Sequence, residues 1–246
     1  MERWIGRLAL VTGASSGIGA ATAKALTKAG MITVGLVRRT ERIYQLKQEL
    51  PNDVANRLHA MQCDVTKEED ILFSFRQIED RFGSPYVLIN CAGFSRNAIR
   101  LLQPNNTQVL RDVIDTNLLG LALCSREAYL SMKKRSIDGH IVHINSIAGH
   151  KVPPFNTVNI YPASKYGVTA LTETMRHEMR LDDSKVKVTS ISPGLVRTEM
   201  TPEEALNCKL PMLEPEDIVE GIIFVLGTRP EVQVHEMIIK PLGEKC

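Results

Sequence analysis

The stretch Leu8-Ala-Leu-Val-Thr-Gly-Ala-Ser-Ser-Gly-Ile-Gly19 decides the fold of this 246-residue chain. Its apolar beginning is typical of a buried strand, and the glycines that follow allow a tight turn into a helix. Such a strand, turn and helix favour a dinucleotide-binding fold, because the free N–H groups at the helix start can hold a pyrophosphate. The spacing is T-G-x-x-x-G-x-G rather than G-x-G-x-x-G, so the prediction depends on the strand before the turn and the helix after it.

Outward from this unit, short apolar segments alternate with helical ones. We expect strands at 8–12, 33–37, 58–63, 87–90, 140–145, 186–192 and 234–239, and helices at 17–29, 40–50, 67–82, 107–135, 160–180 and 216–227. This alternation, without two-residue hairpins, predicts a parallel sheet with helices on both faces. The fold class is therefore α/β: one Rossmann-type, doubly wound domain over residues 1–246, with about seven strands and a ligand site beyond their carboxyl ends.

The composition fits a globular domain and argues against several other classes. Hydrophobic residues make up 43% and charged residues 24%, and a net charge of +2 gives no reason to expect a nucleic-acid partner. The basic cluster Lys133-Lys-Arg135 is expected to be a solvated helix end. No apolar run approaches the roughly 20 residues of a membrane span, and the early first strand leaves no room for a signal peptide. The five cysteines show no paired spacing, so we expect reduced thiols in a cytoplasmic protein.

Two arginines after the second strand indicate which dinucleotide would bind. An acidic residue there would bind the ribose hydroxyls, whereas Arg38 and Arg39 suit a bidentate contact with the 2′-phosphate of NADP. Ser15 could add a hydroxyl donor, and two solvated arginines are the alternative. Asp64, after the third strand, could accept a hydrogen bond from the adenine amino group or cap the next helix, and the sequence does not separate the two. The predicted cofactor is NADP(H).

Tyr161 and Lys165 lie one helical turn apart in the run Tyr-Pro-Ala-Ser-Lys. Tyrosine ionises near pH 10, but a lysine ammonium at i+4 and a positive nicotinamide ring would both stabilise the phenolate. Lowering the pKa by about 3 units requires roughly 4 kcal/mol. Taken alone, the pattern more often marks an ordinary amphipathic helix with Tyr161 in the core and Lys165 at the surface.

The order of motifs resembles that of the short-chain dehydrogenase/reductase family over essentially the full length. The matching elements are Thr12 to Gly19, Asp64, Asn90-Cys-Ala-Gly93, Asn117, Ser146, Tyr161 to Lys165 and Pro193-Gly194. The resemblance implies an oxidoreductase in which hydride passes directly between nicotinamide and substrate carbon, so that no metal is needed.

The same resemblance implies roles for single residues. Tyr161 would exchange a proton with the substrate oxygen, and Ser146 would hydrogen-bond that oxygen. Lys165 would hold the nicotinamide ribose and lower the pKa of Tyr161, and Asn117 would position a water that links Lys165 to solvent. The residues implied at the cofactor are Gly13, Ser15, Ser16, Gly17, Ile18, Gly19, Arg38, Arg39, Asp64, Val65, Asn90, Ala92, Gly93, Tyr161, Lys165, Pro193, Gly194, Val196 and Thr198.

One position departs from the family pattern. The family commonly has Asn-Asn-Ala-Gly after the fourth strand, and this chain has Cys91 as the second residue. The missing amide usually steadies the central sheet, whereas a thiol forms only weak hydrogen bonds. The departure removes no catalytic group.

Apolar residues in the loops after the fourth, fifth and sixth strands indicate the substrate class. They fit a long hydrocarbon or a steroid better than a sugar, and the short segment from Thr198 to Pro215 suggests an open pocket. For each of the residues listed next, ordinary core or loop packing is the alternative, and we assign no catalytic role to His150. The candidates are Phe94, Ile147, His150, Phe155, Leu195, Met200 and Met212.

Further segments resemble a narrower branch of the family, that of the NADP-dependent farnesol dehydrogenases of insects, whose vertebrate relatives reduce steroid and other carbonyls. They are Met1-Glu-Arg-Trp4, Gly139-His-Ile-Val-His-Ile-Asn-Ser146, Leu171-Thr-Glu-Thr-Met-Arg176 and Leu213-Glu-Pro-Glu-Asp217. A chain that shared the insect role would oxidise farnesol to farnesal on the route to juvenile hormone.

Other functions stay open at this point. One is an NADPH-dependent steroid or quinone carbonyl reductase, and another is a non-catalytic dinucleotide-binding sensor. Intact Ser146, Tyr161 and Lys165 argue against the sensor, since a binder has no physical need for all three. The family resemblance also implies a homodimer or homotetramer built on the two long helices.

Overall fold

The computed structural model describes residues 1–96, 99–154, 158–201, 203–207 and 210–244. Its centre is one parallel sheet with the strand order β3-β2-β1-β4-β5-β6-β7. The order reverses between β1 and β4, which is where a doubly wound sheet opens its ligand crevice. The strands are β1 (Leu8–Thr12), β2 (Ile32–Val37), β3 (Leu58–Gln62), β4 (Val87–Asn90), β5 (His140–Ile144), β6 (Lys187–Pro193) and β7 (Glu236–Ile239), each close to its expected bounds.

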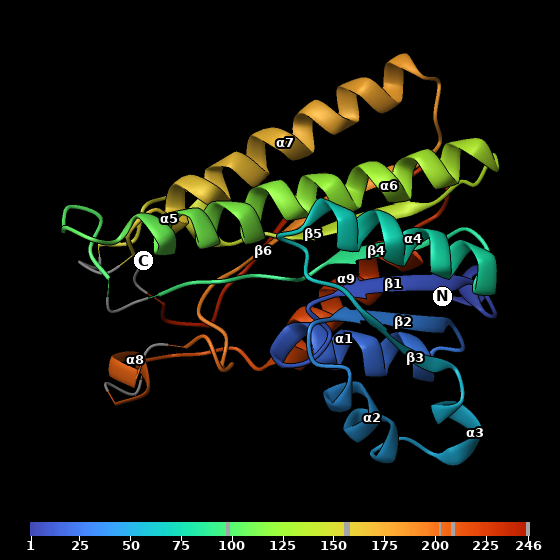
Figure 1. The fold of residues 1–246 in the computed structure, drawn as a ribbon, viewed down its shortest axis with the longest axis horizontal. Coiled ribbons are helices and arrows are strands. Elements are labelled where there is room, and N and C mark those ends of the chain that lie inside the picture. The colour runs from blue at the N-terminus through green and yellow to red at the C-terminus, as the bar shows by residue number, and fades with distance from the viewer. Residues whose placement is uncertain (97–98, 155–157, 202, 208–209, 245–246) are drawn as a thin grey trace.

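Each face of the sheet carries its own apolar core. Along β1, Ala9 and Val11 pack into one buried cluster and Leu8 and Leu10 into the other, because successive side chains of a strand point to opposite faces. One face is covered by α1 (Gly17–Lys28), α2 (Glu41–Gln48) and α9 (Pro215–Gly227), and the other by α4 (Glu68–Phe82), α6 (Leu121–Lys134) and α7 (Tyr161–Leu181) (Figure 1). The expected α/β fold with helices on both faces is confirmed.

Two of the expected helices differ from the structure. The helix expected over 107–135 is interrupted: α5 (Thr107–Ile114) and α6 are joined by a π-helical segment, Asp115–Gly120. Such a segment keeps the helical hydrophobic pattern, so periodicity does not reveal it. The helix expected over 40–50 ends at Gln48, and Pro51 instead caps the short α3 (Asn52–Ala55), since its fixed φ suits a helix start.

The remaining features agree with the sequence. The basic cluster 133–135 lies at the exposed end of α6, as expected. A short helix that the sequence did not indicate, α8 (Glu203–Asn207), lies between β6 and α9. No helix within the described ranges is long and apolar enough to cross a membrane.

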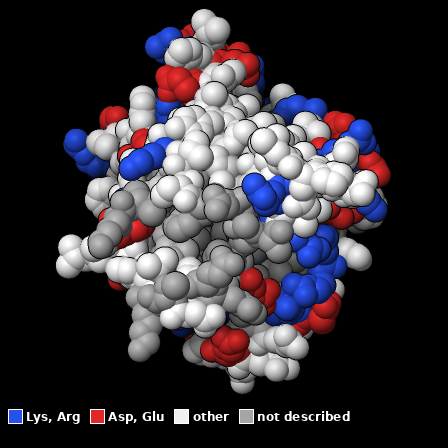
Figure 2. Space-filling model, turned by 90° about the vertical axis from the view of Figure 1, so that its left-hand side faces the viewer, with Lys and Arg blue, Asp and Glu red and all other residues white. Residues whose placement is uncertain are grey.

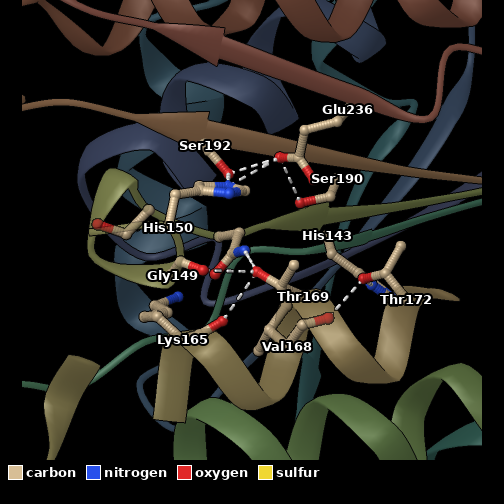
Figure 3. Close-up of polar contacts among 12 residues, drawn as sticks. His143, Gly149, His150, Lys165, Val168, Thr169, Thr172, Ser190, Ser192 and Glu236 are labelled. Atoms are coloured by element: carbon tan, nitrogen blue, oxygen red, sulfur yellow. Dashed lines mark hydrogen bonds and ion pairs between the residues drawn. The ribbon is translucent and has the colours of Figure 1, made fainter. Parts of the chain in front are cut away.

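The central strand β5 carries two fully buried histidines. Nε2 of His143 lies 3.1 Å from Oγ of Ser125, and its Nδ1 lies 2.8 Å from Oγ1 of Thr172 on α7 (Figure 3). Nε2 of His140 lies 2.8 Å from Oγ1 of Thr189. Burial lowers the pKa of both imidazoles to about 3, so both rings are neutral at physiological pH.

These histidines should make the fold sensitive to acid. Below the ordinary histidine pKa of 6.5, the unfolded chain takes up protons that the folded chain does not take up until about pH 3. The free energy of unfolding should therefore fall as pH drops through this window, by about 1.4 kcal/mol per pH unit for each histidine. In urea unfolding between pH 6 and 4.5, His143→Gln should reduce this slope by about that amount.

The exposed His177 on α7 provides the matched control. His177→Gln should keep the slope of the wild-type chain. An unchanged slope in His143→Gln would show that His143 is not the group that excludes the proton.

Candidate active site

The glycine-rich turn forms a cradle that only glycine can build. Gly13 and Gly17 have φ of +66° and +51°, in the left-handed region that other residues rarely adopt. A Cβ on Gly13 would lie 2.7 Å from Cα of Ala92, and a Cβ on Gly19 would lie 2.3 Å from the carbonyl oxygen of Gly13. The turn therefore brings bare backbone to the start of α1, where a pyrophosphate would meet free N–H groups.

Thr12 joins this cradle to the next strand. Its Oγ1 accepts hydrogen bonds from the backbone N–H groups of Cys91 and Ala92, each at 3.0 Å. The ends of β1 and β4 are thus held together at the point where the strand order reverses. The cradle is thereby hydrogen-bonded to the segment after β4, an arrangement that suits a dinucleotide lying across both.

The residues expected at the adenosine end lie on the adjoining surface. Arg38 and Arg39 are exposed directly after β2, and no ion pair involves either of them within the described residues. Asp64 does not cap α4: its Oδ1 accepts from the backbone N–H and the hydroxyl of Thr66, and α4 starts only at Glu68. Two guanidinium groups are therefore available to an anion such as a 2′-phosphate.

Ser146, Tyr161 and Lys165 meet at the carboxyl end of β5. Oγ of Ser146 accepts from the N–H of Ala148, which fixes the side chain and leaves its O–H to donate. The Ser146 side chain is close enough to the Tyr161 hydroxyl to lower its pKa, and Nζ of Lys165 lies 5.7 Å from the centre of the Tyr161 ring. The ammonium donates to the carbonyl oxygen of Ile144 at 3.0 Å. The three side chains therefore lie together at this end of the sheet.

The expected lowering of the pKa of Tyr161 involves a bound nicotinamide, and the chain alone does not produce it. Burial raises this pKa, and the nearby Ser146 side chain offsets the effect only in part. Burial also lowers the pKa of Lys165 to about 8, so its ammonium is kept at pH 7 and lost as the pH rises above 8. The chain alone does not lower the pKa of Tyr161 toward neutrality, so a further positive charge close to the phenol is required.

Asn117 holds the site together from the π-helical segment. It is fully buried, and its side-chain amide bonds both backbone groups of Phe94: Oδ1 accepts from the N–H at 2.7 Å and Nδ2 donates to the carbonyl at 2.9 Å. Nδ2 also lies 3.2 Å from Oγ of Ser164, which donates to the Tyr161 carbonyl at 2.7 Å. These contacts occupy the amide, and a water between Asn117 and Lys165 stays a prediction.

Cys91, the departure from the family pattern, lies next to Lys165. Burial raises the pKa of the Cys91 thiol to about 12, although the Lys165 charge acts in the opposite direction. The thiol is therefore neutral and a poor nucleophile at pH 7. Cys63 and Cys124 are also free and buried, and Cys208 and Cys246 lie outside the described residues.

The expected substrate residues fall into two groups. Met200 contacts Gly93, since its Cε would lie 3.5 Å from a Cβ on that glycine. Phe94, Leu195 and Met212 are half-buried. His150 instead turns toward the edge strand: Nε2 lies 2.9 Å from Oγ of Ser192 and 3.3 Å from Oε1 of Glu236 (Figure 3). Phe155 lies outside the described residues.

Two of the expected substrate residues line a cavity at the edge of the sheet. Ile147 and His150 line a cavity of about 170 Å³ beside β7, and its described lining does not include Ser146 or Tyr161. Their place in the substrate pocket therefore stays a prediction. Figure 2 shows the face onto which the strands open: basic side chains gather on its right-hand side with acidic ones beside them, and the described residues above its centre are mostly uncharged. The other residues that line the cavity beside β7 are Lys151, Pro153, Pro154, Ile238 and Lys240.

The remaining cofactor candidates surround the cradle. Thr198 contacts the cradle, because its Cγ2 would lie 3.0 Å from a Cβ on Gly17. Gly194 donates its N–H to Ile239 at 2.7 Å. Asn90 is turned inward, with Nδ2 donating to Oγ of Ser125 at 2.8 Å. Of the others, Val65, Pro193 and Val196 are buried, and Ser15, Ser16 and Ile18 are half-buried.

Sequence reasoning missed two groups of functional interest. Ser164 lies inside the run Tyr-Pro-Ala-Ser-Lys, but nothing in that run shows that its hydroxyl connects Asn117 to Tyr161. The ion pair between Arg42 and Glu199 joins residues far apart in the chain, and no local pattern indicates it.

Comparisons with known proteins agree with this geometry. The family model described as short chain dehydrogenase matches residues 7–209, which include the glycine-rich turn and Tyr161. The farnesol dehydrogenase of Aedes aegypti is 59% identical over 245 residues, covering 100% of both chains. Dehydrogenase/reductase SDR family member 11 of Mus musculus is 42% identical over 98% of this chain and 96% of its own. The closed form of serine dehydrogenase complexed with NADP+ is 26% identical, with a TM-score of 0.84 over 97% of this chain and 96% of that one.

Replacing Asn117 should damage both stability and activity. Asn117→Ala leaves the backbone groups of Phe94 without partners, which costs about 1–3 kcal/mol and lowers the melting temperature by about 2–12 °C. It also releases Ser164 and the segment after β4, so we expect kcat to fall at least tenfold. Thermal unfolding and initial rates measure the two effects.

Asn106 offers a matched control. It is also buried, and its Nδ2 donates to the carbonyl oxygens of Arg100 and Leu101 at 2.9 Å each. Asn106→Ala should lose stability while keeping kcat. A wild-type kcat in Asn117→Ala would refute the positioning role of Asn117.

Proposed function

This chain belongs to the short chain dehydrogenase family, and we propose that it is an NADP-dependent oxidoreductase that interconverts an apolar alcohol and its carbonyl, with a farnesol-like isoprenoid alcohol favoured. The observation that carries the proposal is the meeting of Ser146, Tyr161 and Lys165 beside the glycine cradle. A cytoplasmic homodimer or homotetramer is part of the same proposal.

The chain's own residues would handle the proton. When bound, NADP+ accepts the hydride from the alcohol carbon. Ser146 donates a hydrogen bond to the substrate oxygen, since the bond that it accepts from the Ala148 N–H uses one lone pair and leaves the O–H group available. Tyr161, as the phenolate, takes the proton from the alcohol oxygen, and in the reverse direction its phenol returns that proton to the carbonyl oxygen.

Two positive charges would lower the pKa of Tyr161 and so favour its phenolate. Burial works against it in this chain, so the Lys165 ammonium and the positive charge of the oxidised cofactor must both act on Tyr161. The Lys165 ammonium, which already donates to the carbonyl oxygen of Ile144, would also donate to the nicotinamide ribose. Proton transfer would therefore depend on cofactor binding.

Three features support the choice of cofactor and substrate. Arg38 and Arg39 are exposed and have no partners among the described ion pairs, as a 2′-phosphate requires. The solved serine dehydrogenase, 26% identical to this chain, is complexed with NADP+. The relative of 59% identity is named a farnesol dehydrogenase, and the half-buried Phe94, Leu195 and Met212 suit a hydrocarbon chain.

An absorbance assay at 340 nm tests the proposal. NADP+ or NAD+ is supplied with farnesol, geraniol, a hydroxysteroid or a short aliphatic alcohol. We expect NADPH formation with farnesol and a slower reaction with the short alcohol. Rapid NADPH oxidation with steroid ketones or quinones, without alcohol oxidation, would instead favour the carbonyl reductase. No turnover in either direction with intact cofactor binding would favour the sensor.

Tyr161→Phe removes the group that exchanges the proton. Because general acid–base catalysis contributes about 10²- to 10⁴-fold, turnover should fall by at least two orders of magnitude while NADPH affinity stays within about twofold. Steady-state rates and fluorescence titration provide the two numbers.

Tyr166→Phe is the control on the same helix, since its hydroxyl donates to the backbone carbonyl of His150 in the segment before that helix. Its turnover should stay within about threefold of the wild-type value. Full turnover in Tyr161→Phe would refute the assigned mechanism.

Replacing Arg38 and Arg39 tests whether these two residues recognise the 2′-phosphate of NADP(H). In Arg38→Ala/Arg39→Ala, NADPH affinity should fall by about tenfold or more, because bidentate charged contacts are lost, while NADH affinity changes by less than about threefold. Parallel titrations with the two cofactors measure the difference. Equal losses for NADPH and NADH would show that these arginines do not recognise the phosphate.

A further inference from the structure

A surface ion pair joins the two sides of the cofactor crevice. Nη1 of Arg42 lies 2.7 Å from Oε1 of Glu199. Arg42 belongs to the first turn of α2, next to the arginines at the adenosine end. Glu199 belongs to residues 194–201, the segment that follows β6 and that we call the lid segment. The two residues are 157 positions apart, so the contact depends wholly on the fold.

Neighbouring contacts place this pair above the glycine cradle. The first turn of α2 packs onto the cradle, since a Cβ on Gly35 would meet Ala14 and Ile43 at 2.9 Å each. Thr198 of the lid segment also contacts the cradle, at Gly17. Arg42 precedes Ile43 and Glu199 follows Thr198, so their ion pair spans the cradle at which the pyrophosphate is proposed to bind.

The lid segment is anchored separately at its base. Val196 pairs with Leu213 as an isolated β-bridge, and Nε of Arg197 lies 2.9 Å from Oε1 of Glu214. These contacts tie the base of the lid to the start of α9 and do not involve the cradle. Glu199, in contrast, is 62% exposed, so its ion pair with Arg42 is a contact on the surface.

The charges favour a holding role for Arg42 over a phosphate-binding one. Arg38 and Arg39 are already available to a 2′-phosphate, whereas the charge of Arg42 is matched by Glu199. A cation in the first turn of a helix is also unfavourable to the helix dipole, and a carboxylate beside it offsets that cost. The geometry therefore gives Arg42 a partner on the lid.

We propose that Arg42 and Glu199 form a latch that holds the lid segment over bound NADP(H) and slows its release. The inference rests on the proposed function, since it presupposes that NADP(H) lies in the cradle. Both are positioning residues and have no part in proton or hydride transfer. An exposed ion pair is a weak restraint, so opening the latch should accelerate release by about two- to fivefold.

Stopped-flow measurement of NADPH release tests the latch. Arg42→Gln, Glu199→Gln and the double variant are compared with the wild type at 50 mM and 1 M NaCl, with excess NADP+ as the displacing ligand. Each single variant should release NADPH about two- to fivefold faster at low salt, and the double variant no faster than the singles. At 1 M NaCl the ratio of variant to wild type should approach one, because salt screens exposed charges.

The pair between Lys24 and Glu49 provides a matched control. Its two atoms are 2.8 Å apart and its side chains are 28% and 54% exposed, close to the 28% and 62% of the latch, but it lies away from the lid. Lys24→Gln should leave the release rate unchanged. An equal acceleration in this control would overturn the latch, because any lost surface pair would then have the same effect.

Two further results would overturn the latch and separate it from the proposed function. Slower release in Glu199→Gln would mean that the carboxylate competes with the phosphate for Arg42. Unchanged release in all variants, with normal NADPH binding, would remove the latch and leave the proposed function standing. A wild-type chain that binds no NADPH would instead overturn the proposed function itself.

Discussion

The hydroxyl of Thr12 fixes the geometry on which the rest of the site depends. By accepting the N–H groups of Cys91 and Ala92, it fastens the end of β1 to the end of β4. The strands come so close that a Cβ on Gly13 would lie 2.7 Å from Cα of Ala92, so glycine is needed at that position. The cradle and the segment that leads to Phe94 therefore cannot move independently, and a ligand on one is placed relative to the other.

From Phe94 the connection continues to the proton-transfer residues. The buried amide of Asn117 bonds the backbone of Phe94 and reaches Ser164, whose hydroxyl donates to the carbonyl of Tyr161. Lys165 is fixed separately on the carbonyl of Ile144. Burial raises the pKa of Tyr161, so the neutral phenol is favoured in the chain alone, whereas Lys165, with a pKa of about 8, keeps its ammonium at pH 7. The need for a further positive charge would link proton transfer to the presence of the oxidised cofactor.

Much of this could be predicted from the sequence, because the signals are local. The apolar runs gave the strands, and the glycine turn gave the first βα unit, since each depends on neighbouring residues alone. The resemblance brought Ser146, Tyr161 and Lys165 together, and the structure places them at one strand end. The roles assigned to these residues stay predictions, as does the choice of NADP.

Other features depend on contacts between distant segments, which local patterns do not encode. The π-helical segment around Asn117 follows the same periodicity as an α-helix, and the ring of His150 is directed by Ser192 and Glu236 on strands much later in the chain. Burial raises the pKa of Tyr161 in the chain alone, an effect that local patterns do not show because the cost of desolvation depends on the whole surrounding fold. The ion pair of Arg42 and Glu199 also joins distant segments of the chain, so no local pattern predicts it.

Direct hydride transfer is the central claim, and isotope transfer measures it most directly. Farnesol carrying two deuterium atoms at C1 is oxidised with NADP+ in ordinary water, and the reduced cofactor is analysed by mass spectrometry. Direct transfer to a cofactor held in the cradle predicts NADPH that contains one deuterium and farnesal that keeps the other. Unlabelled NADPH, or the absence of any reduced cofactor, would contradict it.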